Sequence, residues 1–240
     1  MKIIGLIGGM SWESTALYYR QINEAVKDKL GGLHSAKLIL LSVDFAEIAA
    51  LQRAGDWGAA GDILANAART LQTAGADFLV LCTNTMHIVA PAIEAAVSIP
   101  LLHVADPTAQ AIQAAGFSKV GLIGTRFTME QSFYKDRLIE QHGLQVLVPD
   151  EDDRDTVHRI IFEELCLGQT TAASRAEYRR VMARLVEQGA ECIILGCTEI
   201  TLLVGAEDAS VPLFDTTALH AGAAARQALN TESAPPSPNP

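Results

Sequence analysis

The chain has 240 residues, of which 49% are hydrophobic and 19% charged, and its formal net charge is −10. This composition predicts a globular α/β protein with one large or two compact domains, and the negative charge argues against a nucleic-acid surface. No apolar run reaches the roughly 20 residues of a membrane span, and the N-terminus lacks the pattern of a signal peptide. We therefore expect a cytoplasmic protein that acts on a small molecule, with neither nucleic acid nor membrane as a partner.

In the first half of the chain, apolar runs bounded by turn residues alternate with stretches of helical spacing. The helical stretches include Thr15 to Leu30 and Gly61 to Ala74, and the apolar runs are "KIIGLIGG", "AKLILLSVDF", "DFLVLCTNT" and "IPLLHVADP". Buried runs without polar alternation are typical of parallel strands that are covered by helices on both faces. The first half therefore predicts an α/β lobe.

The first turn, "GGMSWEST", does not predict a dinucleotide site. Its glycines do not follow G-x-G-x-x-G, and no acidic residue ends a ribose-binding strand about 20 residues later. The backbone of this turn can instead approach a small anion, and Ser11 or Ser14 is expected to cap the following helix. A plain strand-to-helix turn is the alternative.

The second half repeats the order of the first. Its apolar runs are "KVGLIGT", "LQVLVP", "ECIILGCTE" and "VPLFDTT". "GLIGG" from Gly5 matches "GLIG" from Gly121, and "GAD...LCTN" from Gly75 matches "GAE...LGCTE" from Gly189; the offsets are about 112 to 116 residues. One tandem duplication explains this period better than a solenoid.

The duplication predicts two pseudo-symmetric, Rossmann-like lobes, each a parallel sheet flanked by helices, with a ligand site in the cleft between them. Their expected bounds are 1–115 and 116–230, with the last helix able to pack back on the first lobe. The proline-rich tail 231–240 is expected to be disordered. The acidic run Asp150 to Asp155 lacks the spacing of a calcium loop and is expected to begin a helix.

Two of the four cysteines follow predicted strands. Cys82 and Cys197 are each followed by a threonine, whereas Cys166 and Cys192 are expected to be core residues. If the lobes face each other, Cys82 and Cys197 approach one cleft from opposite sides. A helix that begins after a cysteine lowers the pKa of its thiol, so one thiolate can remove a proton while the opposite thiol donates one. This arrangement predicts inversion at a carbon atom.

Two other uses of these residues remain open. A hydrolase needs one cysteine with a histidine, and His87 lies five residues after Cys82. A zinc site is disfavoured, because Cys82-x4-His87 and Cys192-x4-Cys197 lack the Cys-x2-Cys pairs of structural zinc sites. His103, which ends a predicted strand, is a weaker site candidate.

With these motifs in place, the chain resembles the aspartate/glutamate racemase family, in particular its bacterial Asp/Glu-specific and broad-specificity amino-acid racemases. The resemblance spans about Lys2 to Asn230. The motifs that carry it are "GLIGGMSWEST", "GGLHSAKLILLSVDF", "LVLCTNTMH", "GLIGTRFTMEQSFY", "IIFEELCLGQ" and "ILGCTEI".

The resemblance implies a racemase that uses no pyridoxal phosphate or other cofactor and no metal, forms a homodimer and binds an amino acid. Cys82 and Cys197 would flank the α-carbon, with Cys197 taking the proton from the L-isomer and Cys82 from the D-isomer. Arg53 matches a region that supplies a carboxylate-binding arginine, with an exposed helix arginine as the alternative. The other substrate-binding positions implied are Met10, Ser11, Thr83, Asn84, Thr85, Thr125, Thr128 and Thr198.

One departure concerns specificity. Some aspartate racemases carry a lysine near "FEELCLGQ", but this chain has no lysine after Lys135. Glutamate, aspartate and neutral amino acids such as homoserine therefore stay open as substrates. The alternatives to an amino-acid racemase are a maleate isomerase, hydantoin racemase or arylmalonate decarboxylase, and a non-catalytic amino-acid-binding protein.

Overall fold

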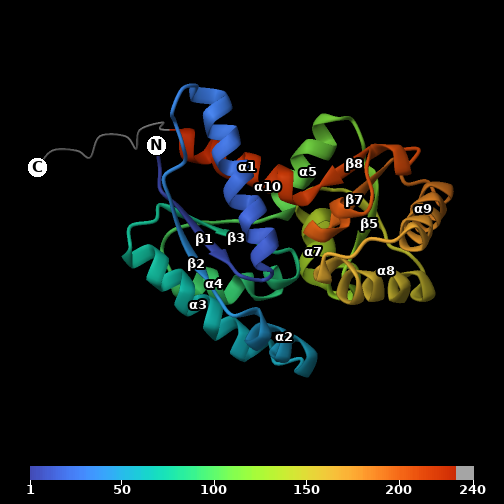
Figure 1. Cartoon of the computed structure of the whole chain (residues 1–240), viewed down its shortest axis with the longest axis horizontal. Coiled ribbons are helices and arrows are strands. Elements are labelled where there is room, and N and C mark those ends of the chain that lie inside the picture. Colours follow the sequence, from blue (N-terminus) through green and yellow to red (C-terminus); the bar gives the residue numbers. More distant parts are fainter. Residues whose placement is uncertain (231–240) are drawn as a thin grey trace, which may run out of the picture.

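The computed structural model describes residues 1–230 as two α/β lobes that lie side by side (Figure 1). Each lobe contains a four-stranded sheet in which every pairing is parallel. The strand orders are β2-β1-β3-β4 and β6-β5-β7-β8, so the two sheets have the same topology. The predicted fold of two pseudo-symmetric α/β lobes is confirmed. The predicted disordered tail lies outside the described residues.

In the first lobe, strands and helices alternate in the predicted order. The predicted helix from Thr15 to Leu30 begins slightly earlier, because Ser11 caps it and its hydroxyl accepts a hydrogen bond from the Ser14 N–H at 3.3 Å. The elements are β1 (Ile4–Gly8), α1 (Trp12–Leu30), β2 (Leu38–Ser42), α2 (Phe45–Ala54), α3 (Trp57–Thr73), β3 (Phe78–Leu81), η1 (Thr85–Val89), α4 (Ala90–Ala96), β4 (Leu101–Leu102) and α5 (Ala105–Ala114).

The second lobe starts at β5 and repeats this plan with shorter helices after its first strand. Asp150 caps α8, so the acidic run begins a helix as predicted, although Asp153 is buried and pairs with Arg180 and Arg184. The elements are β5 (Lys119–Gly124), α6 (Arg126–Glu130), α7 (Ser132–Asp136), η2 (Arg137–Gln141), β6 (Gln145–Leu147), α8 (Glu151–Glu163), η3 (Leu165–Leu167), α9 (Ala172–Glu187), β7 (Cys192–Gly196), η4 (Thr198–Leu202), η5 (Ala206–Asp208), β8 (Leu213–Asp215) and α10 (Thr216–Leu229).

Both faces of each sheet are buried, and successive side chains of a strand enter different cores. In β3, Leu79 and Leu81 pack in the core under α3, whereas Phe78 and Val80 pack in the core under α1 and α10. This alternation follows from the two-residue period of a strand. It decides which strand-end side chains reach the cleft and which remain in the core.

The last helix, α10, follows β8 of the second sheet but packs along α1 of the first lobe (Figure 1). Ala221 and Ala224 are fully buried in the core that contains Ile4 and Tyr18.

Among residues 1–230, no helix is long and apolar enough to cross a membrane. The predicted homodimer and cytoplasmic location stay predictions.

Candidate active site

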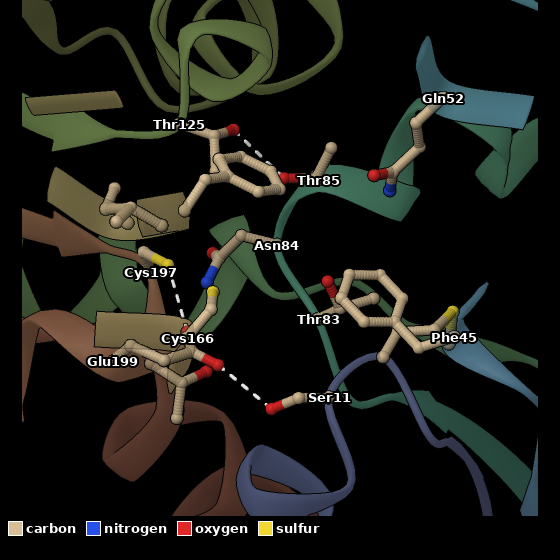
Figure 2. A pocket seen from close by; sticks show the side chains of 15 residues that line it. Ser11, Phe45, Gln52, Thr83, Asn84, Thr85, Thr125, Cys166, Cys197 and Glu199 are labelled. Atoms are coloured by element: carbon tan, nitrogen blue, oxygen red, sulfur yellow. Dashed lines mark hydrogen bonds between the residues drawn. The ribbon is translucent and has the colours of Figure 1, made fainter. Parts of the chain in front are cut away.

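A cleft lies between the lobes, at the carboxyl ends of the central strands. The turn after β1, helix α2 and the segment after β3 form one wall. The turn after β5, helix α8, η3, and the end of β7 with the segment after it form the other (Figure 2). The lining residues are Met10, Ser11, Phe45, Gln52, Thr83, Asn84, Thr85, Thr125, Ile161, Phe162, Cys166, Gly196, Cys197, Thr198 and Glu199.

Cys197 is the predicted catalytic cysteine that lines this cleft. Its thiol donates a hydrogen bond to Glu199 Oε2 at 3.0 Å, and Ser11 of the other lobe donates to Glu199 Oε1 at 3.0 Å (Figure 2). Burial, and next the carboxylate of Glu199, hold the pKa of the Cys197 thiol well above its ordinary value. The resting group is therefore a protonated thiol that points at a proton acceptor.

The register of the two sheets shows which residue of the first lobe is equivalent to Cys197. Ile7 of β1 pairs with Leu81, and the equivalent Ile123 of β5 pairs with Leu195. Counting two residues on from each partner gives Thr83 in the first lobe and Cys197 in the second. Both line the cleft. The residue that faces the cleft opposite Cys197 is therefore Thr83.

The prediction that Cys82 reaches the cleft is wrong in this structure. Cys82 continues the alternation of β3, so its side chain is fully buried in the core under α1 and α10. Burial raises the pKa of its thiol far above the ordinary value. The equivalent position in the second lobe is Gly196, where an added Cβ would lie 3.0 Å from the Ile123 carbonyl oxygen. Cys82 is therefore a core residue.

Asn84 presents an unpaired acceptor to the cleft. The Thr216 hydroxyl donates to the Leu195 carbonyl at 2.9 Å, so it must accept the 3.0 Å bond from Asn84 Nδ2. This arrangement fixes the amide and leaves Asn84 Oδ1 buried without a partner among the described residues. A buried unpaired acceptor is costly, so this oxygen is suited to accept a hydrogen bond from a bound ligand.

Threonine hydroxyls join the two walls. Thr85 of the first lobe bonds Thr125 of the second at 3.0 Å, and Thr125 bonds Thr128 at 3.2 Å. Thr198 bonds Ser14 across the lobes at 2.8 Å. Thr128 does not line the cleft and instead supports Thr125 from behind. The predicted residues that the structure brings together at the cleft are Met10, Ser11, Thr83, Asn84, Thr85, Thr125, Cys197 and Thr198.

Two other predictions need correction. Arg53 lies on the exposed side of α2, and its neighbour Gln52 lines the cleft instead. Successive helix residues point about 100° apart, so both cannot face the same site. Cys166 is only partly buried and lines the cleft, whereas Cys192 is a core residue as predicted. Glu199 lines the cleft without having been predicted as a site residue, although it lies two residues after Cys197 in the motif "ILGCTEI".

His87 forms no catalytic pair with Cys82. Its Nδ1 donates to the Thr83 carbonyl at 2.8 Å and its Nε2 accepts from the Val104 N–H at 3.2 Å. Both ring nitrogens are therefore hydrogen-bonded to backbone groups. Burial and the neighbouring His103 keep its pKa well below the ordinary value. His87 therefore stays neutral and fixes the backbone at Thr83. His103 is buried beside it and also lies outside the cleft lining.

No group of three or more His, Cys, Asp or Glu side chains in the described part of the chain is arranged to hold a metal ion. Nor does the cleft contain the cysteine, histidine and orienting carboxylate of a cysteine hydrolase. What the geometry offers is the Cys197 thiol with a carboxylate beside it, facing a hydroxyl across the cleft. This set of groups can move protons to and from a carbon atom held between the lobes.

Known proteins share this architecture over nearly the whole chain. A protein from Yersinia pestis of known crystal structure is 63% identical, with a TM-score of 0.91 over 96% of this chain and 100% of that one. An aspartate racemase homologue from Pyrococcus horikoshii is 35% identical, with a TM-score of 0.83 over 96% of this chain and 100% of that one.

A curated relative, the broad-specificity amino-acid racemase RacX of Bacillus subtilis, is 25% identical over 62% of this chain and 63% of that protein. The sequence model of the Asp/Glu/hydantoin racemases matches residues 7–224. The register, the cleft and these matches agree with the resemblance found in the motifs. The chain belongs to the Asp/Glu/hydantoin racemase family.

Proposed function

We propose that the chain racemises a free amino acid without pyridoxal phosphate, by proton transfer at the α-carbon in the cleft between the lobes. The observation that carries this proposal is the Cys197 thiol, which lies 3.0 Å from Glu199 and faces Thr83 across the cleft. Binding alone requires neither a thiol nor a proton acceptor beside it. The family relationship supports a racemase-type reaction, and the groups in the cleft favour a mechanism with one cysteine.

The amino acid is held through its backbone groups. Asn84 Oδ1, the unpaired acceptor, receives a hydrogen bond from the α-ammonium group. The hydroxyls of Thr85 and Thr125 donate to the α-carboxylate, giving up the bond between them. Donors at the carboxylate stabilise the enolate-like charge that grows when the α-proton leaves. This places the α-carbon between Cys197 and Thr83.

Cys197 becomes a base by passing its proton to Glu199, which already accepts the thiol hydrogen bond. The backbone N–H of Glu199 points at the same sulfur and favours the thiolate. The thiolate then takes the α-proton from one face, the face presented by the L-isomer in this proposal. Substrate binding beside Glu199 brings the positive charge of the α-ammonium group close to Cys197. This charge stabilises the thiolate and so favours proton transfer from Cys197 to Glu199.

Thr83 supplies the proton on the opposite face. Its hydroxyl donates to the carbanion, and the resulting alkoxide is protonated again by solvent. A hydroxyl is a poorer base than a thiolate, so the two faces have unequal groups. The enantiomers have equal free energies, so kcat/KM must still be the same in both directions. The difference between the thiolate and the hydroxyl is instead expected in the separate values of kcat and KM for the two directions and in the exchange of the α-proton with solvent.

The test is proton NMR of single enantiomers in deuterated buffer with reductant and without pyridoxal phosphate, followed by chiral chromatography. We expect loss of the α-proton and appearance of the opposite enantiomer, both absent in Cys197→Ala and both retained in Cys82→Ala. Saturable binding without loss of the α-proton would identify an amino-acid-binding protein. Activity on a hydantoin or a dicarboxylate alone would identify another reaction of the family.

A further inference from the structure

The cleft contains no cation for a side-chain carboxylate. Its fifteen lining residues include no lysine, arginine or histidine, and Glu199 is its single carboxylate. An amino acid enters with its α-ammonium and α-carboxylate charges balanced. A second carboxylate would bring an uncompensated negative charge beside Glu199, and a buried charge without a partner is strongly unfavourable.

The surroundings of the two cleft thiols agree with this lack of positive charge. Burial, then Glu199 and Glu13, raise the pKa of Cys166 to about 12. Burial and Glu199 act in the same direction on the pKa of Cys197, and no arginine or lysine is among the groups that shift either pKa. The charged side chains that shift the pKa values of these thiols are therefore carboxylates.

The arginines closest in sequence to the lining residues are directed elsewhere. Arg53 follows Gln52 but lies on the exposed side of α2. Arg126 follows Thr125, but it is also exposed and forms an ion pair with Asp155. Neither side chain lines the cleft.

Gln52 is the polar side chain of α2 that lines the cleft. It is 7% exposed, and its Nε2 donates to the Met86 sulfur at 3.0 Å. A thioether sulfur accepts but cannot donate, so the amide nitrogen faces Met86 and the carbonyl oxygen is left for the cleft. Figure 2 shows this amide directed toward Thr85 and the interior. A carbonyl oxygen attracts a donor and repels a carboxylate.

We infer that the enzyme prefers an amino acid with an uncharged, hydrogen-bond-donating side chain, which Gln52 recognises. Phe45, Ile161 and Phe162 supply apolar surface for the methylene groups between the α-carbon and that donor. A side-chain amide or hydroxyl, as in glutamine or homoserine, fits this combination. The inference rests on the proposed racemase function and specifies the substrate class.

The decisive comparison uses substrate pairs that differ in charge but hardly in shape. We expect kcat/KM for α-proton exchange to be at least tenfold higher for glutamine than for glutamate, and higher for asparagine than for aspartate. Faster exchange with the acidic partner in both pairs would overturn the inference and leave the racemase function intact. Exchange with none of the amino acids would reject the racemase function and the inference together.

Two variants of Gln52 test its role. Gln52→Arg should change the glutamine-to-glutamate ratio of kcat/KM at least tenfold in favour of glutamate. Gln52→Leu, which avoids a buried charge, should raise KM for homoserine about tenfold and leave KM for 2-aminobutyrate, which lacks the hydroxyl, within twofold. Arg53→Gln, on the exposed side of the same helix, is the matched control and should leave all ratios unchanged. The assignment of Gln52 would be contradicted by an unchanged glutamine-to-glutamate ratio in Gln52→Arg together with an unchanged KM for homoserine in Gln52→Leu.

Discussion

The ends of β3 and β7 are equivalent in register but differ in chemistry. After Leu195 the second lobe places a glycine and then the cleft cysteine, Cys197, whereas after Leu81 the first lobe places Cys82 and then Thr83. The cysteine of the first lobe is thus one residue earlier, and a one-residue shift moves a side chain to the other face of a sheet. The same backbone therefore supplies a thiol on one side of the cleft and a hydroxyl on the other.

This comparison shows that a duplicated fold need not retain duplicated catalytic groups. Backbone register is held by the ladder of hydrogen bonds and by buried side chains on both faces, so it survives changes in sequence. The side chains at the strand ends are not needed to hold the register in this way. The two halves have kept their geometry while their side chains at the cleft have become different.

The largest effect is expected from replacing the two cysteines separately. Cys197→Ala should lower racemisation and α-proton exchange by about a thousandfold or more, because it removes the proton-transfer group. Cys82→Ala should leave kcat/KM within about threefold and lower the melting temperature, because it creates a small cavity in the core. Steady-state kinetics and thermal unfolding check both. Equal loss of activity in folded Cys82→Ala would restore the mechanism with two cysteines.

Replacing Thr83 should separate inversion from exchange. Thr83→Ala removes the donor on one face, so racemisation should fall about a hundredfold. Cys197 can still remove the α-proton and return a solvent deuteron to the same face. NMR in deuterated buffer should therefore show exchange with retention for one enantiomer. Thr83→Cys should bring kcat for the two directions closer together, and loss of exchange and racemisation in parallel would argue against the assignment of Thr83.

Replacing Glu199 should change the titration of Cys197. Glu199→Gln removes a negative charge that raises the pKa of this thiol, so the thiolate should form at lower pH than in the parent protein. The absorbance of the thiolate at 240 nm, followed against pH with Cys197→Ala as the blank, reports this shift. We expect kcat to fall about tenfold, because the proton acceptor is lost. An unmoved thiolate titration would exclude an electrostatic role for Glu199.

The last prediction concerns stability in acid. Burial lowers the pKa of His220 to about 4 and that of His103 to about 3, and the groups facing them include Tyr18, His87 and Asp106. Both histidines are neutral when folded and titrate near 6.5 when unfolded, so the unfolded chain binds more protons below that pH. Their stabilisation is complete above about pH 6.5 and is lost as the pH falls toward 4 and 3, at up to about 1.4 kcal/mol per pH unit for each histidine.

Thermal unfolding between pH 7 and 4 measures this slope. His220→Gln should flatten it, because the amide does not titrate but can still hydrogen-bond Tyr18 and the Leu102 carbonyl. His34→Gln replaces an exposed histidine and should leave the slope unchanged. An identical slope in the parent protein and His220→Gln would show that this histidine does not contribute.

Much of the fold could be predicted from the sequence, because the apolar runs and their repetition carry it. The site was predicted less completely. The match of Gly75 with Gly189 has an offset of 114 residues, which pairs Cys197 with Thr83, whereas pairing Cys197 with Cys82 requires an offset of 115. Gln52, Phe45 and Phe162 come from helices whose orientation depends on tertiary packing, and no motif marks them.

The path of α10 has a consequence for the synthesis of the chain. Residues 1–115 leave the ribosome before the second lobe, but the face of their sheet that carries Ile4 and Val80 is covered by Ala224 and Ala228, which are translated after the strands of that lobe. The Lys2 N–H also donates to the Ala228 carbonyl at 2.9 Å. The first lobe therefore cannot complete its core during translation, and it becomes vulnerable to aggregation and proteolysis if synthesis stops early.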